Sequence, residues 1–425
     1  MSITVSGPQP RSGLAGDSIA IVLTYFLTAA AGMLFWIVAA RTIPAYELGV
    51  QTALISLITT IGTVTAYGVG SAYKAMLSAP GCVRRKRLVD GLIITVVVSL
   101  TVGTLAGQFA GEAVAGDSIT ALLVPAGALV LALFVLKDAA LIGLHATRSL
   151  PVLNLVSVLV KVGLVVLLTG WLDLPAVWAT VVPAAATTLF AFAFLIPALV
   201  RDPNGVPSHD LPDHRLSRRA MGAFVFRDGV ASSTSFGLIL VLPFLTTWLA
   251  GPVAGATLAI AMAVAQALDF VPDGAGAALT SHMAREPAAA TFHVRRIWLI
   301  STVLVGTGAV VLAIGSPWVG RLFGDGYNDA DFRACLIMVA VGSVLRVPYS
   351  IWMAVLRASL ETRTILRVNT VAFVVSLPTI VYLTHYWGGI GAAVGLAVGS
   401  AVLGGFGAWD LKRRWLGGAS SLNTC

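Results

Sequence analysis

Three basic side chains lie deep inside long apolar stretches of this sequence: Lys137, Lys161 and Arg346. At 1.5 Å per residue, Lys137 is roughly 14 Å and Arg346 roughly 16 Å from the end of its stretch, too deep for the charge to reach surface water. Lys161 is in the stretch after Lys137, and Asn154 shares its helical face. A cation at such depth usually faces a protein interior or a watery cavity, which suggests a translocation path.

Such cations suit a phosphate or diphosphate. An arginine fork binds phosphate oxygens bidentately, and a lysine adds a point charge. We therefore interpret Lys137, Lys161 and Arg346 as candidate phosphate-binding residues lining one cavity. The alternative is that each cation pairs with an internal carboxylate and ties two helices together.

Several carboxylates could fill that second role. Asp269 and Asp273 share a helical face, with Gln266 three residues earlier, so they either neutralise Arg346 or Arg227 or bind a coupling cation or proton. Asp138 adjoins Lys137 but projects about 100° away around the helix, so it is a secondary candidate.

The start of the seventh apolar stretch offers further polar groups. Arg227 and Asp228 either anchor the helix at the membrane surface or make first contact with an entering diphosphate. Side chains that could hydrogen-bond a sugar follow at Ser232, Ser233, Thr234 and Ser235, with Gln266 in the next stretch. Cys82, Cys335 and Cys425 share no motif spacing, so we expect no metal site, disulfide framework or cofactor.

The composition is that of an integral membrane protein, with 57% hydrophobic residues, 11% charged residues and a mean hydropathy of +0.91. An apolar helix of about 20 residues spans the bilayer. Such helices are expected near 17–40, 46–72, 88–111, 118–146, 149–171, 175–200, 223–249, 252–282, 297–319, 331–357, 364–386 and 388–409. The prediction is an all-α protein of about twelve transmembrane helices.

Basic residues predict the orientation. With the N-terminus in the cytoplasm, nineteen of them fall in cytoplasmic segments and three (Arg41, Arg321, Arg333) in outer ones. This asymmetry is typical of membrane proteins and predicts that both termini are cytoplasmic. It also accounts for the net charge of +8 without nucleic-acid binding, since no basic cluster belongs to a soluble domain.

An internal repeat divides the chain. Gly49, Gly68 and Gly70 recur 206 residues later at Gly255, Gly274 and Gly276. Lys137 and Arg346 are 209 residues apart, and Asn154 and Asn369 are 215 apart. We predict two six-helix lobes (1–200 and 223–425, the second with a basic cytoplasmic tail) joined by a cytoplasmic loop (201–222) and related by a parallel pseudo-two-fold axis, with a cavity between them.

These features carry a family resemblance. Ala40-Arg41 with Pro44 and Gly49, then a helix that ends at Gly68-Val69-Gly70, resembles the opening of Wzx-type polysaccharide flippases of the MATE-like superfamily. The resemblance implies alternating access and transfer of a polyprenyl-phosphate- or diphosphate-linked saccharide to the outer leaflet of a bacterial cytoplasmic membrane. Partners would be membrane lipids, a coupling H⁺ or Na⁺, and glycosyltransferases or a polymerase of the same pathway, with the protein itself a monomer.

Two other functions compete. A sodium- or proton-coupled multidrug exporter shares the architecture, but its substrates are commonly cationic, and Lys137, Lys161 and Arg346 would repel them. A membrane glycosyltransferase or polymerase usually needs catalytic residues on a sizeable outer loop, and the outer loops here are short. We therefore expect a transporter and no enzyme.

Overall fold

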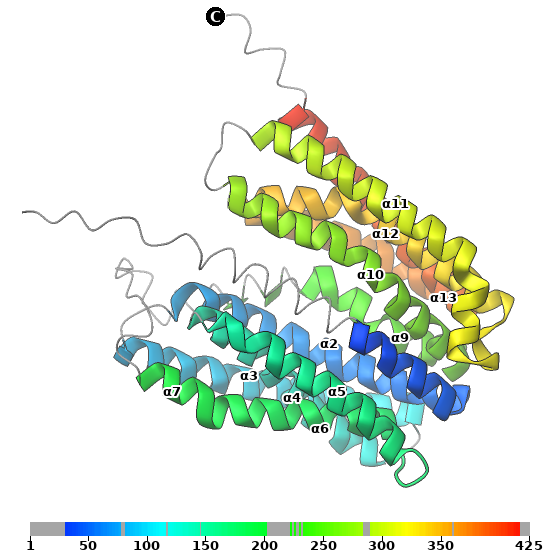
Figure 1. The fold of residues 1–425 in the computed structure, drawn as a ribbon, viewed down its shortest axis with the longest axis horizontal. Helices are drawn as coiled ribbons and strands as arrows, with labels where there is room; N and C mark the ends of the chain where they lie inside the picture. The colour runs from blue at the N-terminus through cyan, green and yellow to red at the C-terminus, as the bar shows by residue number, and fades with distance from the viewer. Residues whose placement is uncertain are drawn as a thin grey trace, which may run out of the picture.

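The structure is a computed structural model that describes residues 30–77, 81–115, 118–144, 146–201, 222, 225–226, 229–230, 233–283, 290–358 and 361–416. Within this part of the chain, regular structure is entirely helical (Figure 1). The helices are Ala30–Thr42, α2 (Ala45–Met76), α3 (Gly81–Ala110), η1 (Gly111–Ala115), α4 (Ser118–Gly143), η2 (Thr147–Ser149), α5 (Leu150–Leu168), α6 (Pro175–Phe190), η3 (Ala191–Leu195), α7 (Ile196–Arg201), η5 (Ser233–Gly237), α9 (Leu238–Ala250), α10 (Pro252–Met283), α11 (Ala290–Phe323), η7 (Asp325–Tyr327), α12 (Ala330–Ala358), α13 (Thr362–Leu411) and η8 (Lys412–Leu416).

The described helices follow the expected apolar segments. Nine are long and apolar enough to cross a membrane, and Ala30–Thr42 and Leu238–Ala250 are shorter apolar helices. α3 and α11 begin seven residues before the expected starts at 88 and 297. The first seven residues of each helix include arginines (Arg84 in α3, Arg295 and Arg296 in α11), and arginine favours helix although it ends the apolar window. The count of twelve spans and the repeat stay predictions.

As one straight helix, the 50 residues of α13 would extend about 75 Å at 1.5 Å per residue, more than twice the hydrocarbon thickness, but the element bends back on itself. The bend is at Gly388, whose φ of 58° and ψ of −136° suit only glycine. Its two arms pack against each other: a Cβ added at Gly395 would lie 2.7 Å from Ile380, and one at Gly399 2.6 Å from the Ser376 hydroxyl. α13 thus contains the two segments expected at 364–386 and 388–409.

The two halves of the chain meet at one end of the bundle, here called the closed end, where the turns at Ile43, Gly251, Gly324 and Gly388 lie. One buried cluster there joins Phe35 and Leu48 of the N-terminal half to residues of the C-terminal half such as Tyr327. Burial raises the pKa of Tyr327 to about 12, so its phenol stays protonated at physiological pH. The halves are therefore joined at the closed end by one apolar core.

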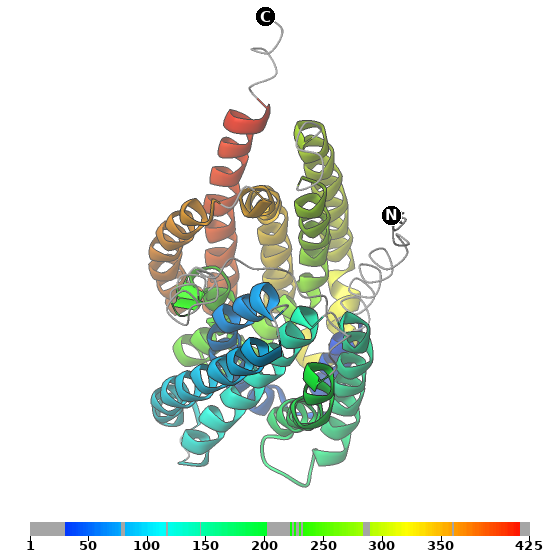
Figure 2. The ribbon, with the colours of Figure 1, turned by 90° about the vertical axis from the view of Figure 1, so that its left-hand side faces the viewer.

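At the opposite end, called the open end, the buried clusters stay within one half. One contains residues of the N-terminal half with only Val225 added, and two contain residues of the C-terminal half alone. α10 diverges from α2 at this end. A Cβ added at Gly274 of α10 would meet no atom within 4 Å, whereas one added at Gly68 of α2 would lie 2.3 Å from the carbonyl oxygen of Val225. Figures 1 and 2 show the two groups of helices diverging toward this end.

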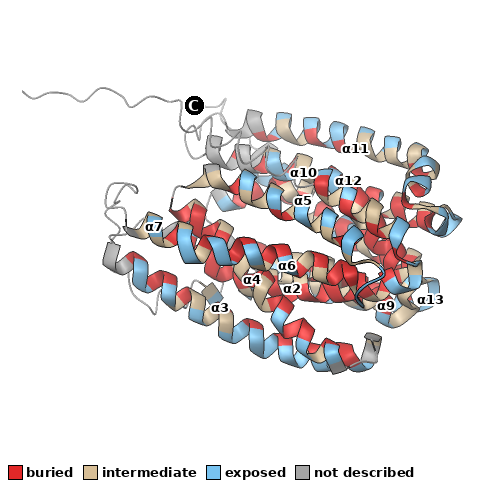
Figure 3. Ribbon diagram, turned by 60° about the horizontal axis from the view of Figure 1, so that its bottom comes forward, coloured by how far each residue is buried: buried red, intermediate tan, exposed pale blue. Residues whose placement is uncertain are grey.

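Burial separates central from peripheral helices. α2, α10 and α12 are mostly buried in their apolar windows, whereas only 17% of the window is buried in α5 and in α11. Figure 3 shows buried residues concentrated on α2 and α4 and exposed residues along α3 and α11. Apolar side chains on the peripheral helices have the lipid chains as their solvent. Of the polar groups that the sequence analysis singled out, Asp269 and Arg346 lie on the central helices α10 and α12, whereas Asn154 and Lys161 lie on the peripheral helix α5.

A polar contact fixes the open end of the C-terminal half. The buried Trp352 Nε1 donates to Asp410 Oδ2 at 2.7 Å, and Asp410 also pairs with Arg414, which reaches Glu361. We expect Asp410→Ala to lower the free energy of unfolding by about 2–4 kcal/mol, because it leaves the indole donor buried without a partner. Unfolding in mixed detergent micelles would measure this, and an unchanged midpoint would contradict it. Glu361→Ala, which removes an exposed partner, should cost under about 1 kcal/mol.

Candidate functional site

Lys137 is fully buried on α4 and ion-paired within its own half. Its Nζ lies 2.6 Å from Asp138 Oδ1 and donates to Asn154 Oδ1 at 2.8 Å, and the Asn154 amide donates to Asp138 Oδ2 at 3.2 Å. The Phe134 ring, one turn away on α4, covers the ammonium with its centroid at 3.8 Å. The positive charge of Lys137 is therefore neutralised by a closed triad between α4 and α5.

The role of Asp138 differs from the sequence prediction. The two Cα–Cβ vectors do project in different directions, but the four-carbon lysine stem carries its ammonium around the helix to the neighbouring carboxylate. The Asp138 side chain keeps 30% of its surface exposed, whereas Lys137 keeps none. Asp138, predicted to be secondary, is thus the counterion of Lys137.

Lys161 is held differently. Its ammonium on α5 lies 3.8 Å from the centroid of Phe35 and 5.9 Å from that of Trp36, both on the helix Ala30–Thr42. Within the described residues it has no ion pair with a carboxylate. Aromatic faces attract a cation through their quadrupole, but they do not neutralise it. Lys161 is half-buried, and its contacts with charged or aromatic groups among the described residues are to these two rings alone.

Arg346 on α12 forms an ion pair with Asp269 on α10. Both side chains are mostly buried, with 18% and 24% of their surface exposed. This ion pair matches one of the two roles that the sequence leaves open for Asp269. It spans two helices, whereas Lys137 takes its counterion from the next residue in its own helix.

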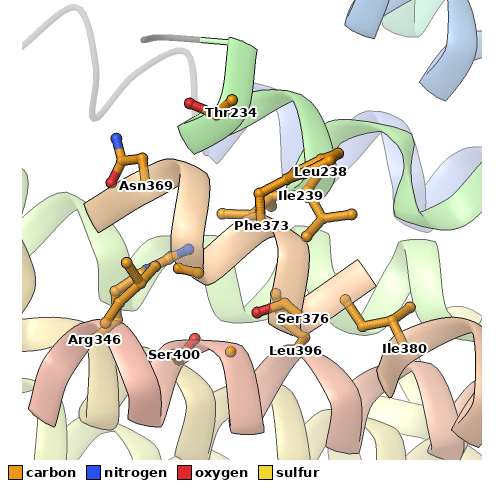
Figure 4. Close-up of a pocket in the computed structure, with 13 residues that line it drawn as sticks. Thr234, Leu238, Ile239, Arg346, Asn369, Phe373, Ser376, Ile380, Leu396 and Ser400 are labelled. Atoms are coloured by element: carbon orange, nitrogen blue, oxygen red, sulfur yellow. The ribbon is translucent and has the colours of Figure 1, made fainter. Parts of the chain in front are cut away.

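Arg346 also lines a small cavity with Asn369, Ser376 and Ser400 of α13 and Thr234 of η5 (Figure 4). Asn369 is 2% exposed and accepts a hydrogen bond from the Tyr349 hydroxyl, and its amide Nδ2 has no partner among the described residues. The volume is about 40 Å³, enough for a few water molecules and far too little for a saccharide. This cavity is a small pocket beside Arg346 that a bulky substrate could not enter as it stands.

The remaining candidate residues are exposed, hydrogen-bonded to nearby backbone carbonyls, or outside the described part of the chain. Asp273 and Gln266 are exposed on α10. Ser233 and Thr234 donate their hydroxyl hydrogens to the carbonyls of Gly229 and Val230, four residues back in the chain. Arg227, Asp228 and Ser232 lie outside the described residues, and the Ser235 side chain is not described.

The contacts arrange the predicted residues in three groups: Lys137 with Asp138 and Asn154, Lys161 with the aromatic pair, and Arg346 with Asp269 beside Asn369. Sequence reasoning did not single out Phe35, Trp36 or Tyr349. Adjacent aromatic residues in the first apolar segment were the only signal for the Lys161 contact, and no spacing rule connects residues 36 and 161.

Comparison with known proteins defines the fold. No protein-family model matches the sequence, and no curated protein matches it significantly. The lipid II flippase MurJ, in an inward closed conformation, aligns over 93% of this chain and 87% of its own, with a TM-score of 0.70 and 14% identity. An inward-facing multidrug resistance MATE family transporter of the MOP superfamily aligns over 95% and 99%, with a TM-score of 0.61 and 16% identity.

A third structure is a MOP superfamily transporter from Pyrococcus furiosus Vc1 (DSM3638), described as having a binding pocket of reverse polarity. It aligns over 96% of both chains, with a TM-score of 0.59 and 15% identity. The apolar helices and buried charges define an all-α, multi-pass membrane protein. Its fold is that of the MATE transporters and of MurJ, and this confirms the fold that the sequence resemblance implied.

Proposed function

We propose that this protein transfers a saccharide linked to a polyprenyl phosphate or diphosphate from the cytoplasmic to the outer leaflet of a bacterial cytoplasmic membrane, for cell-surface polysaccharide synthesis. The fold supports a transporter that alternates between two conformations. The divergence of the halves at the open end supports entry from that side. With both termini in the cytoplasm, as the basic residues predict, the open end faces the cytoplasm.

The observation that carries this proposal is the lack of a carboxylate partner for Lys161 in the described part of the chain. Asp138 neutralises Lys137, and Asp269 neutralises Arg346, but only aromatic rings contact the Lys161 ammonium among the described residues. An unpaired cation in a low-dielectric region is costly, and binding an anion relieves that cost. A phosphate on the cargo supplies such an anion, so we assign Lys161 as its principal contact.

The second candidate function is a cation-coupled multidrug exporter. The exposed Asp273, one turn from Asp269, favours it because an exposed carboxylate attracts cationic compounds. The pocket of reverse polarity described for the Pyrococcus furiosus transporter supports the idea that this fold accommodates cavities of either sign. Lys161 favours an anionic cargo, and we therefore rank the exporter second.

Reconstitution in liposomes tests the proposal. We expect the wild-type protein to move a fluorescent polyprenyl-diphosphate oligosaccharide between leaflets. Lys161→Gln should slow this movement about 10- to 100-fold, because a hydrogen bond between charged groups contributes about 1.5–3 kcal/mol. Lys161→Arg keeps the charge and should retain most of the rate.

Lys412→Gln is the matched control, since it removes an exposed charge at the open end, away from the three groups. Its rate should equal that of the wild type. Equal rates for Lys161→Gln and Lys412→Gln would remove Lys161 from the substrate site. No movement of the lipid by folded wild-type protein, together with efflux of a cationic dye driven by a Na⁺ or H⁺ gradient, would transfer the assignment to the drug exporter.

A further inference from the structure

The closed end brings backbone against backbone. A Cβ added at Gly49 of α2 would lie 1.9 Å from the carbonyl oxygen of Pro252, the first residue of α10. The Thr247 hydroxyl, at the end of α9, donates to the Gly49 carbonyl at 3.5 Å. A glycine is required at such an approach because any side chain would collide with the partner helix. The start of α2 therefore sits directly on the turn between α9 and α10.

Arg41 connects the same two halves through charge. It lies in the last turn of the helix Ala30–Thr42, and its Nε donates to the Leu322 carbonyl at 2.8 Å while its Nη2 donates to the Arg321 carbonyl at 3.3 Å. Those carbonyls belong to the last turn of α11. The last carbonyls of a helix have no partner within the helix and form the negative end of its dipole. Arg41 thus caps a helix that belongs to the other half.

We propose that Arg41 is a latch that stabilises the conformation with the closed end shut. Its guanidinium satisfies the end of α11 only while the halves touch, because its own helix and α11 lie in different halves. When the halves separate there, the guanidinium and the Leu322 carbonyl must find water, while the Arg321 carbonyl keeps only the hydrogen bond that it accepts from the Gly324 N–H at 3.3 Å. The latch sets the balance between two conformations whatever the cargo, so it goes beyond the proposed function.

Arg333 provides a matched comparison at the same end. Its Nη2 donates to the backbone carbonyl of Asn328 at 3.3 Å and to that residue's side-chain oxygen at 3.1 Å, within one half of the chain. The two arginines therefore make similar contacts, and only those of Arg41 cross between the halves. Removing either guanidinium changes the charge equally, and only the loss of Arg41 should change the separation of the halves.

Double electron–electron resonance measures that separation. Spin labels at Asp173→Cys, between α5 and α6, and Asp331→Cys, on α12, lie on exposed positions of different halves at the closed end, in a chain whose native cysteines are replaced by alanine. A Gly49→Ala background populates both conformations, because the new methyl group presses on Pro252. In that background, Arg41→Gln should raise the ratio of separated to closed molecules about tenfold, equivalent to about 1.4 kcal/mol.

Arg333→Gln should leave the ratio unchanged. An unchanged ratio for folded Arg41→Gln, or equal shifts for both variants, would overturn the latch. If Arg41→Gln does not fold, Arg41→Lys replaces it. A lysine keeps the charge but loses the fork, so a shift of about twofold to fivefold is expected and no shift would again overturn the proposal. The measurement needs no transport, so its failure is distinguishable from failure of the proposed function.

Discussion

Replacing Asp138 with alanine should lower the free energy of unfolding by about 3–5 kcal/mol, because it leaves the ammonium of Lys137 buried without a counterion. Lys137 has no exposed surface, and its other contacts are a neutral amide and an aromatic ring. Neither supplies a negative charge. The variant must therefore deprotonate the lysine, admit water to it or open the contact between α4 and α5.

Two further variants test whether the loss of stability comes from the unpaired charge of Lys137. Lys137→Met together with Asp138→Ala removes both charges and should recover most of the lost stability, since an apolar pair often replaces a buried ion pair without loss. Asp173→Ala removes an exposed carboxylate and should change stability by less than about 0.5 kcal/mol. Unfolding in mixed micelles measures all three. Equal midpoints for Asp138→Ala and Asp173→Ala would show that Asp138 does not neutralise Lys137.

The helices were predictable because the physics behind them is local. Apolar length fixes a membrane helix wherever it occurs, so the segments at 364–386 and 388–409 could be placed on either side of Gly388 before their bend was known. The closing of the halves at one end was not predictable. It depends on contacts such as that of Gly49 with Pro252, which join residues some 200 positions apart.

The sequence predicted which cations belong to the candidate site, but it did not predict which side chains contact them. Depth in an apolar segment identified Lys137, Lys161 and Arg346, because the cost of an unpaired charge rises with depth. Their neutralisation depends on reach in three dimensions. A lysine stem bends back to the adjacent Asp138, an arginine crosses from α12 to Asp269, and Lys161 meets aromatic rings of the first helix. Helical-wheel angles describe Cβ directions, which long side chains do not follow.

Arg346→Met should both destabilise the protein and slow transport. It strands the Asp269 carboxylate, which is three-quarters buried, at a cost of about 2–4 kcal/mol. It also removes the guanidinium beside the pocket of Asn369 and Ser400, and we expect the flipping rate to fall at least about tenfold. Stability alone would not distinguish a structural ion pair from a substrate contact, because a less stable protein also transports less.

The double variant Arg346→Met with Asp269→Leu separates the two roles. It leaves no stranded charge, so its stability should return to within about 1 kcal/mol of the wild type. If the ion pair only ties α10 to α12, the flipping rate returns with it. We expect the rate to stay low, because a phosphate-bearing cargo gains from a guanidinium fork and gains nothing from an apolar pair. Recovery of both quantities would make Arg346 a structural residue and leave Lys161 as the phosphate contact among the three buried cations.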